Sequence, residues 1–243
     1  MGTYQQKKII IIGATSGIGR ALAERMMADG HRVGITGRRE ELLKEMAASH
    51  PQKYVYRCFD VTDTVDAVRH MAGLAEALGG VDIVVICAGG GDVNPSLDFE
   101  TERQMINLNV VAFTCLADWA FTYFKRQGYG HLAAITSVAG VRGSRQAPAY
   151  SATKAYQIAY LQGLRQKAKK ERTGIVVTDL CPGFVDTPAA KSPVRFWVSP
   201  VEKAAQQIHQ GLIRQRKVVY VTRRWRLVAA LYRWLPNGLH ERL

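Results

Sequence analysis

Three residues near the middle of the chain have the types and the spacing that proton transfer requires. Ser137 ends an apolar run, Tyr150 follows thirteen residues later, and Lys154 lies four residues beyond the tyrosine. The pattern from Tyr150 onward is helical, so Tyr150 and Lys154 should lie one turn apart on the same face. A nearby ammonium lowers the pKa of a phenol, which is otherwise about 10. A serine hydroxyl at a strand end could orient a substrate carbonyl toward that phenol.

A tyrosine and a lysine at this spacing also occur by chance on surface helices, so the hypothesis depends on the rest of the chain. The chain has 243 residues, of which 47% are hydrophobic, enough for one large α/β domain. No apolar run approaches the roughly 18 residues that span a bilayer, and the N-terminal segment does not have the pattern of a signal peptide. The cysteines show no metal-binding spacing, and we expect them to be reduced thiols of a cytoplasmic protein: Cys58, Cys87, Cys115 and Cys181.

A glycine-rich turn near the N-terminus has the pattern of a dinucleotide-binding site. Lys8–Ile12 is a short apolar run, typical of a strand that is buried on both faces. Gly13, Gly17 and Gly19 follow it, and a helical pattern then runs to Gly30. The glycines allow the backbone to approach a pyrophosphate, and the start of the helix favours its negative charge. The spacing is GxxxGxG rather than GxGxxG.

The end of the second predicted strand indicates which nicotinamide cofactor is preferred. Residues 32–36 form this strand, and Gly37, Arg38 and Arg39 follow it. An acidic residue at this place binds the ribose 2′-hydroxyl of NAD, whereas an arginine accommodates the 2′-phosphate of NADP. No acid is present there, so we expect NADP(H) to be preferred over NAD(H), chiefly through Arg38. The alternative is that both arginines are solvated residues at the start of a helix.

Apolar strands and helical stretches alternate along the rest of the chain. This alternation predicts an α/β fold, a single-domain Rossmann-type doubly wound parallel sheet of about seven strands with helices on both faces. One long helix should run from Glu102 to Gln127 and contain Asn107 and Asn109. A second glycine cluster at residues 88–91 indicates either close approach to a ligand or a flexible loop. The remaining strands are predicted at residues 54–59, 81–87, 131–136, 174–180 and 217–222.

Taken together, these motifs resemble those of the short-chain dehydrogenase/reductase family over residues 8–221. The family's glycine turn corresponds to Gly13–Gly19, with Ile12 in place of its usual threonine. Its Asn-Ala-Gly motif corresponds to Cys87-Ala88-Gly89, so that a cysteine replaces the asparagine. Asn109 rather than Asn107 has the family's spacing to the serine. The resemblance implies an Asp-Val pair near the adenine and a Pro-Gly segment near the nicotinamide, at residues 60–61 and 182–187.

The resemblance also implies a mechanism and a set of site residues. Tyr150 would give a proton to a carbonyl oxygen, Lys154 would hold the nicotinamide ribose, and Ser137 would orient the carbonyl. Asn109 would position a water in the proton relay. The resemblance further implies a small carbonyl or alcohol substrate and a homo-dimer or homo-tetramer. The implied cofactor-binding residues are Gly13, Thr15, Ser16, Gly17, Ile18, Gly19, Arg38, Asp60, Val61, Ala88, Gly89, Tyr150, Lys154, Pro182, Gly183, Val185 and Thr187.

Two other functions fit parts of these patterns. A catalytically silent sensor of the cofactor, or a scaffold, could use the same fold, but such a protein would be expected to lose Tyr150 or Lys154. An epimerase or dehydratase acting on nucleotide sugars would resemble an extended form with GxxGxxG and a larger C-terminal domain. Turnover of any carbonyl or alcohol would separate the enzyme from the sensor.

The net charge of +13 is concentrated near the C-terminus. Residues 214–243 contain eight lysines and arginines and one acidic residue. No nucleic-acid-binding motif is present, so we do not expect nucleic acid as a partner. We divide the chain into a dinucleotide-binding and catalytic domain, residues 1–222, and a basic amphipathic arm, residues 223–243. The arm packs either against its own domain or another subunit, or lies on an anionic membrane surface. Its predicted apolar arc consists of Trp225, Leu227, Val228, Leu231, Tyr232, Trp234 and Leu235.

Overall fold

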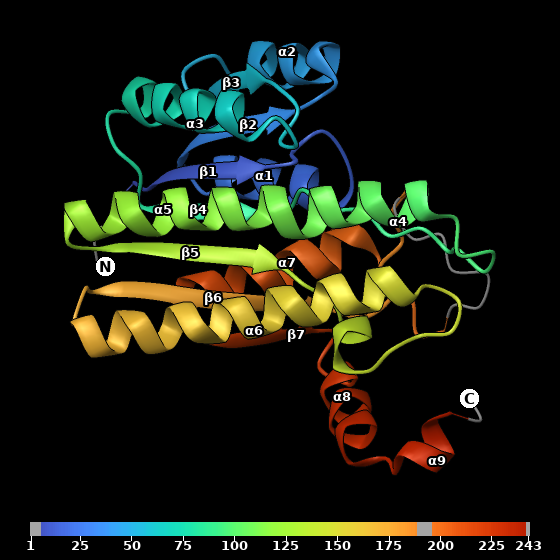
Figure 1. Ribbon diagram of the computed structural model, residues 1–243. Coiled ribbons are helices and arrows are strands. Elements are labelled where there is room, and N and C mark those ends of the chain that lie inside the picture. The colour runs from blue at the N-terminus through green and yellow to red at the C-terminus, as the bar shows by residue number, and fades with distance from the viewer. Residues whose placement is uncertain (1–5, 189–195, 242–243) are drawn as a thin grey trace.

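The computed structural model, which describes residues 6–188 and 196–241, contains a parallel sheet of seven strands. The strands lie in the order β3-β2-β1-β4-β5-β6-β7, and each pairs in parallel with its neighbour (Figure 1). This order confirms the predicted doubly wound sheet. The strands are β1 (Lys8–Ile12), β2 (Arg32–Gly37), β3 (Tyr54–Cys58), β4 (Ile83–Ile86), β5 (Gly130–Ile135), β6 (Ile175–Pro182) and β7 (Val218–Val221).

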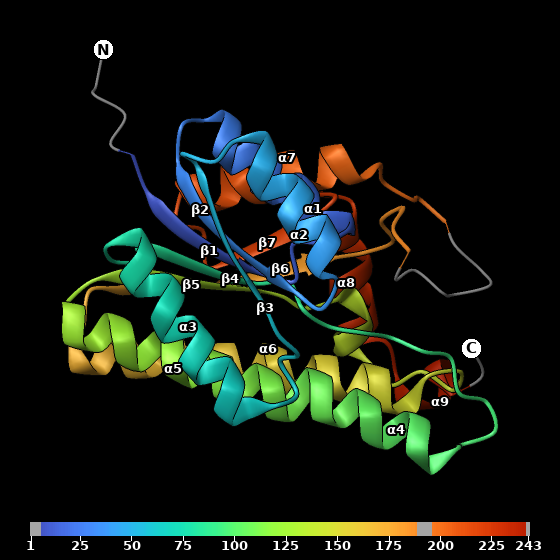
Figure 2. The same ribbon diagram turned by 90° about the horizontal axis from the view of Figure 1, so that it is seen from above.

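Helices cover both faces of the sheet. Figure 2 shows α1, α2 and α7 on one face and α3, α5 and α6 on the other. A parallel sheet requires this arrangement, because each crossover returns the chain along one face. The α-helices are α1 (Gly17–Ala28), α2 (Glu40–Ser49), α3 (Thr64–Leu78), α4 (Phe99–Ile106), α5 (Phe113–Gln127), α6 (Pro148–Glu171), α7 (Val201–Ile213), α8 (Trp225–Trp234) and α9 (Asn237–His240).

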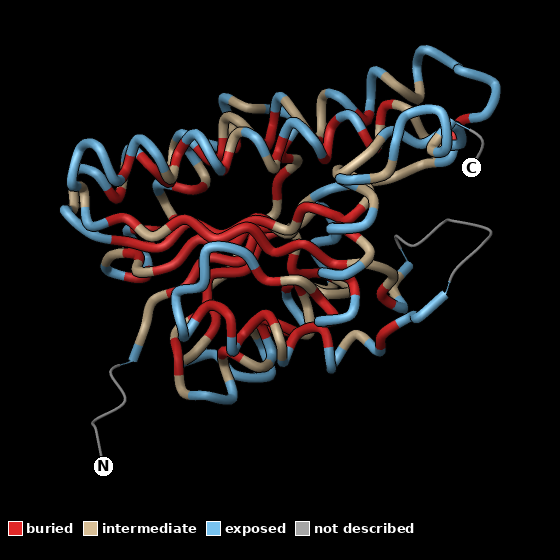
Figure 3. Tube along the Cα trace, turned by 90° about the horizontal axis from the view of Figure 1, so that it is seen from below, coloured by how far each residue is buried: buried red, intermediate tan, exposed pale blue. Residues whose placement is uncertain are grey.

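The core lies on the two sides of the central strands. The four isoleucines of β1, residues 9–12, are fully buried and alternate between two clusters of apolar side chains. One cluster joins the sheet to α3, α5 and α6, and the other joins it to α1, α2 and α7. Figure 3 shows the buried strands as the continuous centre of the molecule. The apolar runs predicted as strands are therefore the residues that both helical layers cover.

The order of the strands reverses between β1 and β4, and two glycine loops meet at this point. Gly13 follows β1 with a φ of +86°, which an L-residue rarely adopts. A Cβ at Gly13 would lie 2.7 Å from the backbone nitrogen of Ala88, which follows β4. Glycine is therefore required for this close approach. In open α/β sheets, ligands bind outside the carboxyl ends of the strands at such a switch point.

The long helix predicted from Glu102 begins earlier and is irregular in its middle. Asp98 caps α4, because its carboxylate accepts a hydrogen bond from the Thr101 backbone N–H at 2.8 Å. Between α4 and α5 the chain forms a π-helical stretch, η1, over Asn107–Ala112. Single π-turns inside helices occur frequently at functional sites. The irregularity lies where the sequence places its two asparagines.

The same continuous helical stretch is long and apolar enough to cross a membrane by composition. It runs from Phe99 to Gln127, and no second stretch of the described residues meets that test. Its buried residues, which include Phe113, Leu116 and Phe124, pack against the sheet. The core of the α/β fold therefore accounts for the buried part of its apolar character.

Candidate active site

The four predicted catalytic residues come together at the carboxyl end of β4 and β5. Ser137 follows β5 and is hydrogen-bonded to Tyr150 on α6. The Lys154 ammonium lies 5.9 Å from the centroid of the Tyr150 ring. A Cβ at Gly89 would lie 3.3 Å from Asn109 Oδ1 and 3.4 Å from Lys154 Nζ. The structure thus brings Asn109 and Lys154, which are 45 residues apart in the chain, to the same glycine.

Asn109 holds the glycine loop after β4 in place. Its Oδ1 accepts a hydrogen bond from the Gly90 N–H at 3.1 Å, and its Nδ2 donates to the Gly90 carbonyl at 2.8 Å. The same Nδ2 lies 3.1 Å from Thr153 Oγ1 on α6. The side chain is fully buried, so these bonds satisfy groups that have no access to water. They explain why an asparagine occupies the middle of a helix.

Gln157 belongs to the site, although no sequence motif pointed to it. The Lys154 ammonium donates to Gln157 Oε1 at 2.9 Å and to the Ile135 carbonyl at 3.0 Å. Gln157 Nε2 in turn donates to the backbone carbonyl of Asn109 at 2.8 Å. Asn109 was expected to position a water, and its backbone carbonyl instead accepts a hydrogen bond directly from the Gln157 side chain. The sequence did contain one signal that could have identified Gln157, since it lies three residues beyond Lys154 and so on the same helical face.

Burial shifts the pKa values of the two central groups in opposite senses. Burial raises the pKa of the Tyr150 phenol, and the hydrogen bond with Ser137 offsets this only in part. Burial lowers the pKa of the Lys154 ammonium to about 8, against the opposing effects of Asp179, Cys181 and Cys87. The predicted lowering of the Tyr150 pKa by Lys154 is not found in this structure, where burial raises that pKa and the Ser137 hydrogen bond lowers it. The physical reason is that a buried phenolate loses its hydration.

The glycine turn and the start of α1 fit a dinucleotide. A Cβ at Gly19 would lie 2.1 Å from the Gly13 carbonyl oxygen, so the turn closes only with glycine. The Ser16 side chain does not cap α1, and the first turn of α1 carries no acidic residue. The N–H groups at this helix start are therefore available to an anion such as a pyrophosphate. Ile18 and Val61, also predicted to contact cofactor, belong to the apolar cores.

Two arginines lie at the end of β2, and their surroundings differ. Arg39 Nη2 donates to Thr15 Oγ1 at 2.6 Å and to Ser16 Oγ at 2.7 Å, across the glycine turn. Arg38 is largely exposed, and its Nη1 lies 3.6 Å from Asp60 Oδ2. Burial acts to raise the pKa of Asp60, but hydrogen bonds from Thr62 and the Arg38 charge bring it below its usual value. Both guanidinium groups therefore border the place expected for the adenosine ribose.

The segment after β6 borders the same site from the other side. Pro182 ends β6, and the Gly183 N–H donates to the Val221 carbonyl at 2.7 Å. Val185 is buried and pairs with Ser199 in an isolated bridge. Thr187 lies against the glycine turn, because a Cβ at Gly17 would be 3.2 Å from its methyl group. The expected substrate loop after Thr187 includes residues 189–195, which lie outside the described residues.

The beginning of the C-terminal arm packs against the segment after β6. This is the arrangement expected if the arm packs against its own domain. A Cβ at Gly183 would lie 2.0 Å from the Trp225 ring, so the indole sits directly on the glycine. Trp225 is 4% exposed and shares an apolar cluster with Val138 and Cys181. Val138 begins the 3₁₀ turn η2 (Val138–Val141), immediately after Ser137. The arm therefore supports both the backbone after β5, which carries the predicted catalytic residue Ser137, and the backbone after β6.

Arg142 ties the other end of α8 to the same segment. Its Nε donates to the Tyr232 carbonyl at 2.9 Å, and its Nη1 donates to Asn237 Oδ1 at 2.7 Å. Its Nη2 donates to the Leu235 carbonyl at 2.5 Å. The last carbonyls of a helix have no partner within the helix, and here one guanidinium satisfies two of them. Arg142 lies just beyond η2, so it joins the Ser137 segment to the arm.

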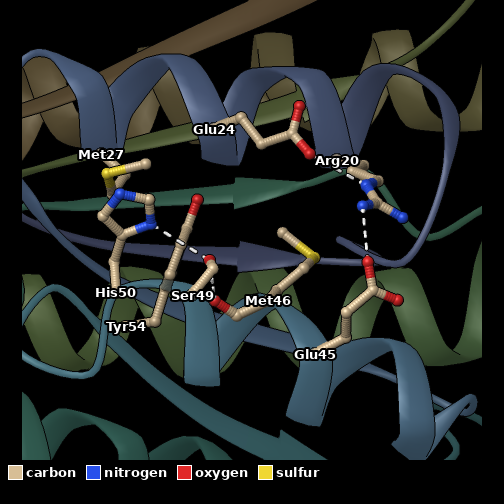
Figure 4. Close-up of a pocket in the computed structure, with 8 residues that line it drawn as sticks. All are labelled: Arg20, Glu24, Met27, Glu45, Met46, Ser49, His50 and Tyr54. Atoms are coloured by element: carbon tan, nitrogen blue, oxygen red, sulfur yellow. Dashed lines mark hydrogen bonds and ion pairs between the residues drawn. The ribbon is translucent and has the colours of Figure 1, made fainter.

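A separate pocket of about 270 Å³ lies between α1 and α2 (Figure 4). Arg20 forms an ion pair with Glu24 on the same helix at 2.9 Å and another across the pocket with Glu45 at 3.4 Å. Met27, Met46 and other side chains form the rest of its lining. None of the predicted catalytic groups lines this pocket, so we do not assign it to the catalytic reaction.

A family model described as short chain dehydrogenase matches residues 7–195. The chain belongs to the short-chain dehydrogenase family. This membership makes the protein an oxidoreductase of a family that acts on CH–OH groups with NAD(P). The resemblance stated from the motifs is thereby confirmed.

Relatives of this short-chain dehydrogenase include two bacterial proteins named as uncharacterized oxidoreductases. The one from Staphylococcus epidermidis is 31% identical over 192 residues, which cover 77% of this chain and 82% of the relative. The one from Staphylococcus haemolyticus is 32% identical over 182 residues, which cover 74% of this chain and 78% of the relative. Both matches extend over most of the oxidoreductase fold.

Solved structures show the same fold. A short-chain dehydrogenase from Streptomyces avermitilis has a TM-score of 0.80 and 25% identity, over 95% of this chain and 97% of that chain. A structure of ElxO with NADP bound has a TM-score of 0.78 and 19% identity, over 89% of this chain and 97% of that chain. The first supports the family, and the second shows the likeness of fold alone.

We expect cofactor affinity to depend on the ionisation of Lys154. The ammonium is the form that can donate to ribose hydroxyls, so NADPH affinity should be higher below about pH 8 and should fall as the pH rises through that value. Gln157→Leu removes an acceptor that favours the ammonium, so the midpoint should move to lower pH. Titration of NADPH fluorescence between pH 7 and 10 measures both midpoints.

Lys154→Arg serves as the control for this pH dependence. Its guanidinium stays charged across the whole range, so the affinity of this variant should be nearly independent of pH. A wild-type affinity that does not change through pH 8, or a midpoint that rises in Gln157→Leu, would contradict the assignment.

We expect Arg142 to support turnover without contributing to cofactor binding. Arg142→Ala leaves helix-end carbonyls of α8 without their partner and loosens the segment that carries Ser137. Small displacements of a reacting group reduce rates strongly, so kcat should fall by about tenfold or more. The NADPH dissociation constant should stay unchanged, because the glycine turn lies at the other side of the site. Arg145→Ala, an exposed arginine three residues further on, is the matched control. Equal kcat values for the two variants would refute the role of Arg142.

Proposed function

We propose that the protein is an NADP(H)-dependent oxidoreductase that interconverts a carbonyl compound and a secondary alcohol. The observation that carries the proposal is the gathering of Ser137, Tyr150 and Lys154 at the carboxyl end of the strands, where Lys154 lies beside Gly89 and Tyr150 beside Gly91. Ligands bind at this end of open α/β sheets. Membership in an oxidoreductase family supports the same reaction class.

The side chains divide the reaction between them. The bound cofactor would supply or accept the hydride at the substrate carbon. The Ser137 hydroxyl donates a hydrogen bond to the substrate oxygen and orients it toward Tyr150. The Tyr150 O–H gives its proton to that oxygen as negative charge develops there. Burial raises the pKa of this phenol, so it remains protonated at neutral pH, which is the form that reduction requires.

Lys154 and its partners complete the site. Its ammonium would hold the nicotinamide ribose through hydrogen bonds to the hydroxyls. Gln157 and the Ile135 carbonyl keep the ammonium at a fixed place, since each accepts a hydrogen bond from it. Asn109 holds Gly90 and thereby keeps the loop beside the cofactor close to β4. Lys154 thus supplies the positive charge, while its partners and Asn109 fix the positions of the ammonium and the loop. None of these groups needs to move during proton transfer.

The preference for NADP(H) rests on the end of β2. The first residue after the strand is Arg38, and no acidic side chain is present at residues 36–39 to accept from a 2′-hydroxyl. Arg38 is exposed, and Arg39 lies across Thr15 and Ser16 at the glycine turn. A charge-assisted contact with a phosphate contributes roughly 1.5–3 kcal/mol. At about 1.4 kcal/mol per tenfold, this gives on the order of a ten- to hundredfold preference.

We propose a cytoplasmic assembly of two or four copies that acts on a small molecule and binds no nucleic acid. Exposed apolar side chains on the outer helices, such as Phe99 and Val111, support an assembly. Residues 1–222 form the dinucleotide-binding and catalytic domain in this proposal. Residues 223–243 form a basic amphipathic C-terminal arm in the same proposal.

Tyr150→Phe tests the proposed reaction. The variant keeps the ring and its packing but has no proton to give, so kcat should fall by at least about a hundredfold, the usual lower range for general acid catalysis. Its NADPH affinity should be retained. The assay is a screen of ketones and secondary alcohols that follows the absorbance of the reduced nicotinamide. Tyr156→Phe, on the same helix, loses only a hydrogen bond with Thr114 and should remain active. More than a tenth of wild-type kcat in Tyr150→Phe would disprove the role of the phenol.

The arginines at the end of β2 provide a test of cofactor preference. The wild type should bind NADPH on the order of ten- to a hundredfold more tightly than NADH. Arg38→Ala and Arg39→Ala should each reduce that ratio, and the double variant should nearly abolish it, whereas Arg69→Ala on α3 should leave it unchanged. Arg38→Asp is a cleaner reversal than Gly37→Asp, because a Cβ at Gly37 would lie 2.6 Å from Thr15 Cγ2. Equal or tighter binding of NADH by the wild type would overturn the assignment.

A further inference from the structure

The outer side of α8 carries a stripe of large apolar side chains in contact with solvent. Leu227, Leu231 and Trp234 are 74%, 64% and 87% exposed. Their spacing of four and then three residues places them on one face of the helix. We call these three residues the α8 stripe. Large apolar residues gathered on a surface mark an interaction site more often than scattered ones do.

The stripe cannot be buried by a simple rotation of the helix, because the other side of α8 is already packed. Trp225 and Ala229 are 4% and 1% exposed and belong to the cluster with Val138 and Cys181. Arg142 holds the C-terminal end of the helix through its hydrogen bonds. Figure 1 shows α8 and α9 projecting from the body of the molecule near the carboxyl end of β5. The stripe is therefore held on the outside.

Basic side chains adjoin the stripe. Arg226 and Arg233 are exposed and seven residues apart, so they share a face of α8 that lies between the stripe and the buried side of the helix. Arg223 is also exposed, just before the helix. None of these three arginines forms an ion pair with any residue in the described parts of the chain. Their guanidinium groups are exposed, although the charge of Arg233 also lowers the pKa of the buried Asp179.

A second aromatic surface lies beside the start of the helix. Arg224 Nη2 donates to the Trp197 carbonyl at 2.8 Å, and its guanidinium carbon lies 5.1 Å from the centroid of the Trp197 ring. Phe196 and Trp197 are 45% and 49% exposed. Tryptophan and arginine favour the boundary between lipid headgroups and acyl chains. Phe196, Trp197 and Arg224 therefore extend the exposed apolar and basic surface from the α8 stripe to the loop before α7.

We propose that the α8 stripe and its arginines bind the surface of an anionic lipid bilayer. The apolar side chains would enter the boundary of the headgroups, and the arginines would contact the anionic lipids beside them. A second copy of the chain fits this surface less well. Three side chains can bury at most roughly 600 Å², below the about 800 Å² per partner of specific interfaces. A symmetric contact would also bring Arg226 and Arg233 against the same residues of the second copy.

Binding of this kind would orient the enzyme. Because α8 packs against the Ser137 and Gly183 segments, the carboxyl end of the sheet would face the lipid. The contact itself does not depend on the proposed redox reaction, since neither cofactor nor turnover takes part in it.

The experiment is flotation of the purified full-length protein with vesicles, without cofactor. Vesicles of phosphatidylcholine alone are compared with vesicles that contain phosphatidylglycerol in addition, at low and high salt. The wild type should float with the anionic vesicles at low salt and not with the neutral ones. Leu227→Glu combined with Leu231→Glu should abolish flotation. An arginine near an anionic surface contributes roughly fivefold in affinity, so Arg226→Ala with Arg233→Ala should weaken binding about 25-fold.

Control variants test whether flotation depends on the stripe itself rather than on charge or on a loss of folding. Val65→Glu combined with Val68→Glu, which places the same two charges at exposed apolar positions on α3, should float like the wild type. Circular dichroism and NADPH binding of the stripe variants should match those of the wild type. The proposal is overturned if the wild type does not float, if neutral vesicles bind equally, or if the stripe variants still float. It is also overturned if sedimentation shows that these variants instead dissociate an oligomer, which would assign the stripe to a second copy.

Discussion

The burial of a positive charge at the end of the central strands is the constraint on which the site depends. The Lys154 side chain lies almost completely inside the protein, and a buried ammonium is tolerated only when acceptors surround it. The Ile135 carbonyl and Gln157 supply those acceptors. Gln157 in turn bonds the Asn109 backbone, and the Asn109 side chain holds Gly90. One chain of hydrogen bonds thus joins α6, η1 and the loop after β4.

A second set of contacts closes the site from the C-terminal side. Trp225 sits on Gly183, and Arg142 reaches back from the Ser137 segment to the end of α8. Residues near the C-terminus therefore support two backbone segments that border the reacting groups. The helix that provides this support also presents an apolar and basic surface outward. Its inner face serves the active site, while its outer face is free to contact lipid.

Much of the fold could be predicted because its elements carry local patterns. The alternation of apolar runs and helical periods indicated the parallel sheet, and the four catalytic candidates lie together as the motifs implied. The boundaries were less accurate. The long helix begins at Phe99 rather than Glu102, because the Asp98 cap extends it, and β6 continues to Pro182 through pairing with β7. Pairing and capping of this kind depend on partners that periodicity does not reveal.

By itself, the sequence determined the alternation of strands and helices, the glycine turn and the one-turn spacing of Tyr150 and Lys154, since each arises from residues that are close in the chain. Only the tertiary structure decided that Gln157 donates a hydrogen bond to the backbone carbonyl of Asn109, 48 residues away. It likewise decided that Arg142 donates a hydrogen bond to the Tyr232 carbonyl near the end of α8, 90 residues later. It also decided that burial raises the pKa of the Tyr150 phenol. The physical reason is that hydrogen-bond partners and desolvation depend on which surfaces meet, and no local pattern encodes that.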